Sequence, residues 1–295
     1  MSPTTPAFPP RVAAIHDLSC FGRCALTVIM PTLSVMGYQV IPVPTALLST
    51  HTGGFTDLHF RDLTADMEAI TDHFTRLGTT FRAIYTGFLG SAEQIETVSH
   101  ILDRFGTLPD ENGQAPLILI DPVMGDDGEL YSTYTPELVR GIRSLSYRAQ
   151  LLTPNLTEAC ILTDTPYRDT AVMRPEEALS FAETLLEKLT VVTSGRIVIT
   201  GISLSDGTLA NLGRDADGSH FCIRRPHEVH SYPGTGDLFA SVLLGAFLRG
   251  DSFRNACAAA AEFTSEVIHA SIPIATPERE GVALEPMLWK LIPQR

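Results

Sequence analysis

Short apolar runs alternate with amphipathic segments along most of this chain. Six runs of five or six residues are typical of strands buried on both faces: 11–16, 39–44, 82–87, 117–121, 149–153 and 196–201. Strands separated by helix-length segments form right-handed βαβ units, which place parallel strands in one sheet with helices on both faces. We therefore expect an α/β fold of three layers, with a mainly parallel central sheet.

Two segments have the clearest helical patterns. Over 60–77, apolar residues recur three and four positions apart, as on one face of a helix: Phe60, Leu63, Met67, Ile70, Phe74 and Leu77. A second helix is predicted to start at Ser91, because Gln94 completes a capping-box pattern three residues later. Late in the chain, 207–213 and 219–225 flank a turn-rich segment and predict an antiparallel hairpin.

The formal net charge of −13 argues against a general surface for nucleic acid or anionic membranes. A phosphorylated ligand stays open, since helix N-termini and magnesium can hold phosphate without a basic surface. Five cysteines spread along the chain are an odd number and do not resemble a secreted disulfide framework, which favours the cytoplasm. No run approaches the ~20 apolar residues of a membrane span.

The first ten residues, MSPTTPAFPP, contain four prolines and have neither the basic start nor the apolar stretch of a signal peptide. We expect a flexible arm over residues 1–10. The remainder, 11–295, is expected to form a single domain, because 44% hydrophobic residues in a chain of this length supply one large core.

Polar residues follow the predicted strands, at the sheet edge where such folds bind ligands. Asp121 ends one run and precedes a Pro-Val-Met-Gly turn, which suits a magnesium ligand beside phosphates. The alternative is an ordinary turn rich in Asp and Gly. Farther on, Asn155 and Glu158 have the spacing of a capping box and also bring an amide and a carboxylate to the same edge. For Asn155 and Glu158, a role in capping a helix and a role in a ligand site are compatible.

The run 196–201 ends in Thr200 and Gly201, where a hydroxyl and a backbone without a side chain can approach phosphate. The segment 46–55 follows the second predicted strand and is polar and rich in glycine. It is either a surface loop or a substrate loop that uses His51 and Thr52.

The stretch Gly234-Thr235-Gly236-Asp237 precedes an apolar helix predicted over 238–248. The glycines let backbone N–H groups turn toward one point, and the helix dipole adds to an anion hole for a phosphoryl group in transfer. Asp237 could orient an attacking hydroxyl and accept its proton late, since the dipole is expected to keep the carboxylate ionised and weakly basic. The alternative is that Asp237 only caps the helix.

A metal site near the N-terminus is the weaker interpretation of Cys20, Cys24 and His16, because C-x₃-C without a second Cys/His pair is poor zinc spacing. Gly22 in the same stretch fits a tight turn over a ligand better.

Together, STHTGG, GFLGS, DPVMGD, TPNLTE and PGTGD occur in an order that resembles the ribokinase-like superfamily, and specifically its vitamin B6 kinases, over about residues 11–270. The resemblance implies a ribokinase-like fold, a homodimer, and transfer of the γ-phosphoryl of ATP to the primary 5′-hydroxyl of pyridoxal, pyridoxine or pyridoxamine. DPVMG is shared with hydroxymethylpyrimidine kinases, so that activity stays open, as does a sensor without turnover. The intact GTGD and both magnesium carboxylates argue against the sensor.

The resemblance also implies residue roles. Asp237 would be the catalytic base. The anion hole would consist of Gly234, Thr235 and Gly236. Magnesium, accompanying ATP, would be held directly or through water by Asp121 and Glu158. ATP would be contacted by Thr153, Asn155, Thr200 and Gly201, and Asp126 would lie near the nucleotide or a monovalent cation such as K⁺. The pyridine substrate would contact Ala46, His51, Thr52 and Phe88.

Two departures from the B6 kinase pattern concern the substrate turn. Asp17 stands where many members have a serine that contacts the pyridine, and Ala25-Leu26 stands where they have Gly-Asn. A carboxylate prefers a protonated pyridine nitrogen or an exocyclic amine to a neutral donor. The hypothesis is that Asp17 adapts this chain to pyridoxamine or pyridoxine at least as well as to pyridoxal.

Overall fold

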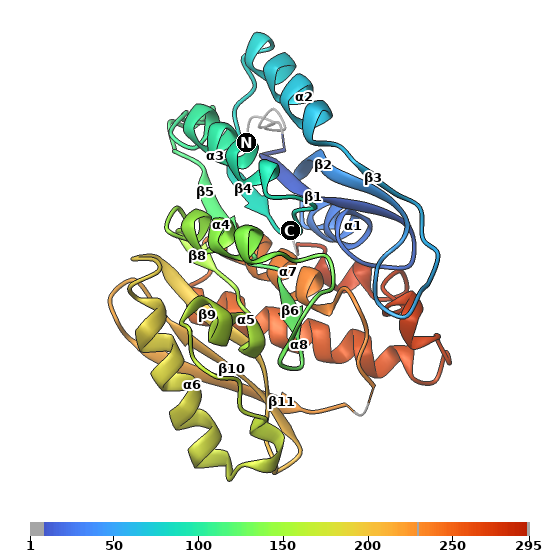
Figure 1. Cartoon of the computed structure of the whole chain (residues 1–295), viewed down its shortest axis with the longest axis vertical. Helices are drawn as coiled ribbons and strands as arrows, with labels where there is room; N and C mark the ends of the chain where they lie inside the picture. The colour runs from blue at the N-terminus through green and yellow to red at the C-terminus, as the bar shows by residue number, and fades with distance from the viewer. Residues whose placement is uncertain (1–8, 229, 294–295) are drawn as a thin grey trace, which may run out of the picture.

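A computed structural model describes residues 9–228 and 230–293. Its nine-stranded sheet has the order β11-β10-β9-β8-β5-β4-β1-β2-β3 (Figure 1). The strands are β1 Arg11–Phe21, β2 Gln39–Thr50, β3 Phe60–Asp62, β4 Ala83–Thr86, β5 Leu117–Ile120, β8 Leu151–Leu152, β9 Arg196–Ser203, β10 Thr208–Arg214 and β11 His220–Pro226. The six from β9 to β2 are parallel, and β3, β10 and β11 are antiparallel to their neighbours. A separate hairpin consists of β6 Gly125–Asp126 and β7 Glu129–Leu130.

The helices form a layer on each face of this sheet. One layer contains α2 Thr64–Arg76, α3 Glu93–Phe105, α4 Pro136–Ser146, α5 Leu156–Leu162 and α6 Pro175–Leu189. The other contains α1 Leu26–Val35, α7 Thr235–Arg249 and α8 Phe253–Ser271. Successive strand residues serve opposite layers: in β1, Ala13 and Ile15 pack with the first, and Val12 and Ala14 with the second. This explains why the strands are apolar throughout, and it confirms the predicted three-layer α/β fold.

The sheet confirms all six predicted strands and the late hairpin, and it corrects several boundaries. β2 continues to Thr50, because its backbone pairs with β1 as far as Phe21 and with β3 on the other side. The first half of the predicted loop 46–55 is therefore strand. Likewise β9 does not end at Gly201: it continues to Ser203 through an irregularity in its pairing with β10, at which Gly201 has φ +71°.

Two details of the predicted helices are wrong. Phe60 belongs to the edge strand β3, and α2 begins only at Thr64. Ser91 does not cap α3, whose N-cap is Ala92 without a side-chain hydrogen bond. Gln94 instead points inward, donating to the carbonyl of Thr45 and accepting from the backbone of Gly90 at 2.8 Å each. Tertiary contacts thus use the polar residue that the local pattern assigned to a cap.

No helix in the described part of the chain is long and apolar enough to cross a membrane. The five cysteines are free thiols. Most of the predicted arm, residues 1–8, lies outside the described residues; Pro9 and Pro10 are exposed, and β1 begins directly after them.

Candidate active site

The GTGD stretch is the first turn of α7. Gly234 is the N-cap with φ 81°, and a Cβ there would lie 2.2 Å from the carbonyl oxygen of Arg23. Only glycine fits this close approach. A Cβ at Gly236 would meet nothing within 4 Å, so the protein leaves space beside that turn. The Thr235 hydroxyl donates to the carbonyl of Tyr232 at 3.0 Å. The free N–H groups of a first helical turn and an open flank together form an anion-binding site.

Asp237 lies in this turn and does not cap it. Its Oδ2 accepts a 2.7 Å hydrogen bond from the backbone N–H of Ala25, at the start of α1. The interpretation of Asp237 as merely a helix cap is therefore wrong. Burial, reinforced by the charge of Asp17, raises the pKa of Asp237 to about 7. Burial thus opposes the effect expected of the helix dipole, which would keep this carboxylate weakly basic.

Ala25 is the residue that stands where the B6 kinases have glycine. It is the N-cap of α1 with φ 47° and ψ −131°, a conformation that an L-residue with a Cβ adopts at a cost. The substitution therefore leaves the backbone in the glycine-like conformation. That conformation aims the N–H of Ala25 at Asp237.

The capping box of α5 is confirmed. The Asn155 side chain accepts from the backbone N–H of Glu158 at 2.8 Å, and Glu158 Oε2 accepts from the backbone N–H of Asn155 at 2.8 Å. Glu158 Oε1 accepts a further bond from the N–H of Met124 at 3.0 Å. Both oxygens of this buried carboxylate are thus held by the backbone.

The predicted site carboxylates influence one another in a series. Burial, and then the charge of Asp237, raise the pKa of Asp121 well above its usual range. Burial, and then the charge of Asp121, do the same for Glu158. At the other end, burial raises the pKa of Asp17 to about 6, opposed by a 2.9 Å hydrogen bond from Ser19. The structure therefore brings these four residues, which are far apart in the sequence, into one buried acidic region.

This acidic region is suited to bind magnesium only if phosphate groups supply further ligands. The described residues contain no group of three or more His, Cys, Asp or Glu side chains arranged to hold a metal. Mg²⁺ is normally bound by one or two carboxylates plus substrate phosphates and water. Asp121 and Glu158 supply such a pair, and a bound cation would favour the ionised form of both carboxylates, whose pKa values are raised mainly by burial.

The residues predicted to contact ATP surround this pair. Asn155 and Thr200 form a parallel bridge next to β9, and Thr153 follows β8 in a buried position. The Asn155 amide is committed to the fold, since its Nδ2 also donates to the carbonyl of Gly125 at 2.8 Å. Gly201 is exposed at the irregularity in β9, and Asp126 is exposed in the β6–β7 hairpin. Backbone groups and hydroxyls, rather than the Asn155 amide, are therefore free for a nucleotide.

The predicted substrate residues differ in accessibility. Ala46 is fully buried within β2, whereas Thr52 is exposed. His51 has both ring nitrogens engaged: Nδ1 accepts from Gly53 N at 3.1 Å, so Nε2 donates to the carbonyl of Arg279 at 2.6 Å. His51 thus ties the glycine-rich loop to the C-terminal segment. Phe88 packs half-buried against the core, with its ring centroid 6.1 Å from that of Tyr134.

Sequence reasoning missed Tyr131 in this region, and it considered His16 only as a weak metal-site candidate with Cys20 and Cys24. Burial, and then the charges of Glu158, Asp126, Asp237 and Asp121 in that order, raise the pKa of Tyr131, so its phenol lies among the site carboxylates. His16 lies behind Asp237, with Nδ1 3.9 Å from Asp237 Oδ1. No local motif marks either residue, because both reach the site through tertiary packing.

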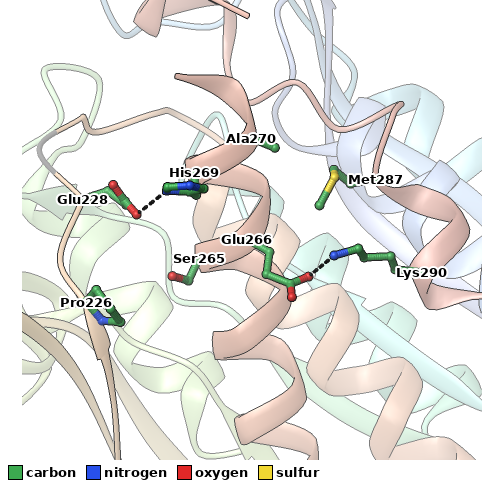
Figure 2. Close-up of a pocket in the computed structure, with 8 residues that line it drawn as sticks. All are labelled: Pro226, Glu228, Ser265, Glu266, His269, Ala270, Met287 and Lys290. Atoms are coloured by element: carbon green, nitrogen blue, oxygen red, sulfur yellow. Dashed lines mark hydrogen bonds and ion pairs between the residues drawn. The ribbon is translucent and has the colours of Figure 1, made fainter. Parts of the chain in front are cut away.

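A cavity of about 450 Å³ lies between the end of β11, α8 and the turn η3 Leu288–Leu291, and none of the predicted site residues lines it. Figure 2 shows two ion pairs on its walls, Glu228–His269 at 3.1 Å and Glu266–Lys290 at 2.9 Å.

Comparison with known proteins identifies the family. The sequence matches the model of the phosphomethylpyrimidine kinase family over residues 12–280. The chain belongs to this family. The match confirms the resemblance to the ribokinase-like superfamily.

Individual members of the family resemble the chain over nearly their whole lengths. A Bacteroides thetaiotaomicron protein assigned to the phosphomethylpyrimidine kinases, in a crystal form with pyridoxal, is 38% identical with a TM-score of 0.84, covering 96% of this chain and 95% of that one. Pyridoxal kinase from Lactobacillus plantarum is 28% identical with a TM-score of 0.84, covering 96% of each chain. The pyridoxine/pyridoxal/pyridoxamine kinase of Bordetella avium is 29% identical over 292 residues, covering 94% of this chain and 93% of the relative.

Proposed function

We propose that this kinase transfers the γ-phosphoryl of ATP to the primary 5′-hydroxyl of a vitamin B6 vitamer, as in salvage of pyridoxal 5′-phosphate. The observation that carries the proposal is the position of Asp237, whose carboxylate is anchored by Ala25 N–H within the open first turn of α7. A proton acceptor and an anion-binding turn next to each other are what phosphoryl transfer to a hydroxyl requires.

In this proposal Asp237 Oδ1, the oxygen not bonded to Ala25, accepts the substrate hydroxyl hydrogen and holds the hydroxyl in line with the phosphoryl group. The N–H groups of Gly234, Thr235 and Gly236 stabilise negative charge on the transferred group. The proton moves to Asp237 as the new O–P bond forms and the bond between the γ-phosphorus and the bridging oxygen of ATP breaks, so that ADP leaves. A pKa of about 7 makes the carboxylate a better base at neutral pH than an unperturbed Asp. Magnesium, held by Asp121 and Glu158, would neutralise charge on the phosphates.

Asp17 supports a role in recognising the vitamer. Asp17 is 6% exposed, and Ser19 donates to its Oδ2 at 2.9 Å, which leaves Oδ1 for another donor. Asp17 also acts electrostatically on Asp237, which places the two carboxylates in the same acidic region. We propose that Asp17 binds a protonated pyridine nitrogen or an exocyclic amine, favouring pyridoxamine or pyridoxine at least as much as pyridoxal.

The alternative substrate is hydroxymethylpyrimidine or its phosphate, which the matched family name favours. A coupled ATPase assay over pyridoxal, pyridoxine, pyridoxamine and hydroxymethylpyrimidine separates the possibilities. Turnover of at least one B6 vitamer with a higher kcat/KM than hydroxymethylpyrimidine is the expected result. The reverse order would assign the thiamine-precursor activity. Folded protein without turnover on any of the four would indicate a sensor.

The remaining proposals rest on the family resemblance. Residues 11–295 would act as one kinase domain, in a homodimer that light scattering would detect. A monovalent cation would bind near Asp126, where partial desolvation of the carboxyl group and then the charge of Asp127 raise its pKa although the residue is exposed. The odd number of cysteines supports a location in the cytoplasm.

A further inference from the structure

His16 in β1 is a buried polar residue for which the proposed reaction has so far no use. Its side chain is fully buried, and among the described residues neither Nδ1 nor Nε2 has a hydrogen-bond partner. Leaving a buried polar group unpaired costs free energy, so a purely structural role would be served better by an apolar residue. We therefore expect the imidazole of His16 to have a hydrogen-bond partner in another state of the protein.

The surrounding strand is shaped around this imidazole. The Tyr85 ring contacts it edge-on, with centroids 4.3 Å apart and planes at 76°. Glycine at position 87 makes room for it, because a Cβ there would lie 2.3 Å from His16 Cε1 and 2.4 Å from Nδ1. Tyr85 in β4 and Gly87 just after it thus define the space that the ring occupies.

Its Nδ1 faces the carboxylate of Asp237. The distance from Nδ1 to Asp237 Oδ1 is 3.9 Å, and Oδ1 is the oxygen that Ala25 does not bind. Complete burial lowers the pKa of His16 to about 3, so the ring is neutral at any ordinary assay pH. A neutral imidazole has one N–H to donate, and a shift of about 1 Å would bring Nδ1 within hydrogen-bonding distance.

We propose that His16 is a positioning residue, whose neutral Nδ1–H donates to Asp237 Oδ1 and, with the Ala25 N–H on Oδ2, fixes the plane of the carboxylate. With both oxygens held, the remaining lone pair of Oδ1 points to one place, where the attacking hydroxyl binds. We call these two hydrogen bonds to Asp237, from Ala25 N–H and His16 Nδ1–H, the clamp. Its role in turnover rests on the proposed kinase function, whereas the contact between His16 and Asp237 does not.

Kinetics of two substitutions test the clamp. His16→Asn retains an amide donor close to the Nδ1 position, and His16→Leu fills similar space without a donor. We expect His16→Leu to lower kcat by about 10- to 100-fold with the KM values for ATP and vitamer nearly unchanged, the size expected from a misplaced catalytic group. His16→Asn should recover most of kcat. Tyr85→Phe, which keeps the aromatic contact, serves as the control and should resemble wild type.

Equal losses in the Asn and Leu variants, or unchanged kcat in Leu, would overturn the proposal. A measurement without substrate tests the contact between His16 and Asp237 independently of the kinase assignment. ¹⁵N-histidine NMR of the full chain shows which ring nitrogen of His16 carries the proton. The Nδ1–H form, with a proton shift that changes in Asp237→Asn, is expected. An Nε2–H form insensitive to Asp237→Asn would refute the contact, even if the enzyme phosphorylates B6 vitamers. If no vitamer is phosphorylated while the Nδ1–H signal responds, the function fails and the contact stands.

Discussion

Two carboxylate regions lie at the carboxyl edge of the sheet, and they are built differently. In the base region, a backbone N–H group, that of Ala25, binds only one oxygen of Asp237, and the other oxygen faces His16 Nδ1 at 3.9 Å and keeps a lone pair for a substrate. In the cation region, Glu158 has both oxygens fixed by the N–H groups of Met124 and Asn155, and Asp121 lies beside it. Burial raises the pKa in both regions, so burial alone does not distinguish their roles. The number of carboxylate oxygens bound by backbone N–H groups does distinguish them: one in Asp237 and two in Glu158.

This difference separates a residue that must change its bonding during a reaction from one that must not. A general base gains a proton and a new hydrogen-bond partner, so an oxygen with an available lone pair is needed. A carboxylate that contributes fixed charge near magnesium and phosphates can be rigid, and Glu158 is anchored at the helix start that it caps. Substitutions in the base region should therefore alter rates, whereas those in the cation region should alter stability and nucleotide binding.

The largest effect is expected for Asp237→Asn. The amide cannot accept the substrate proton, so kcat should fall by about 10²- to 10⁴-fold, the range of general base catalysis.

In wild type, kcat/KM should rise with pH through about 7, because only the ionised carboxylate is a base. Since the raised pKa makes the native state bind more protons than the unfolded state between pH 4 and 7, wild-type stability falls over this range. The variant should lack that contribution and melt higher than wild type at pH 8. A fully active Asp237→Asn variant would refute the assignment of Asp237 as the general base.

Glu158→Gln should mainly reduce stability. The amide can accept only one of the two backbone N–H bonds and turns its own donors toward the other, at a cost of about 1–3 kcal/mol. Urea unfolding of the variant beside Asp121→Asn checks this, since the Asp121 change should cost much less. If Asp121→Asn were the more destabilising, the assignment of Glu158 as the anchored member of the pair would be wrong.

Asp17→Ser should change substrate preference more than overall rate. Losing a charged hydrogen bond to the vitamer predicts a drop of about 10-fold in kcat/KM for pyridoxamine relative to pyridoxal. Competition between the two vitamers in one reaction, with products separated by chromatography, measures the ratio directly. An unchanged ratio would remove Asp17 from vitamer recognition and leave its bond to Ser19 as its role.

The smallest effect is expected for Ala25→Gly. Glycine relieves the positive φ of 47° but adds freedom to the unfolded chain, so the net gain should be about 1 kcal/mol. Thermal unfolding measures it, and kcat should change little because the N–H that holds Asp237 is retained. If Ala25→Gly lowered stability, the positive φ of Ala25 would not be a strained conformation. A large loss of kcat in this variant would show that the Ala25 Cβ helps to orient the N–H toward Asp237.

Sequence patterns predicted what depends on neighbours along the chain. Apolar runs located the strands, and the spacing of Asn155 and Glu158 located a capping box that the structure contains. The hydrogen bond from Ala25 to Asp237 joins residues 212 positions apart, so no local pattern reports it. For the same reason the pKa of Asp237 could not be predicted from its helix position. The end of β2 at Thr50 was missed because pairing with two neighbouring strands, not hydrophobicity, extends it.

Calorimetric titration of ATP with and without Mg²⁺ into Asp237→Asn and Asp121→Asn tests the division into base and cation regions most directly. Asp237→Asn should bind MgATP as tightly as wild type while lacking turnover. Asp121→Asn should lose most of the Mg²⁺-dependent gain in affinity. If Asp237→Asn abolished MgATP binding, or Asp121→Asn retained its full dependence on Mg²⁺, the two regions would not have the separate roles assigned to them.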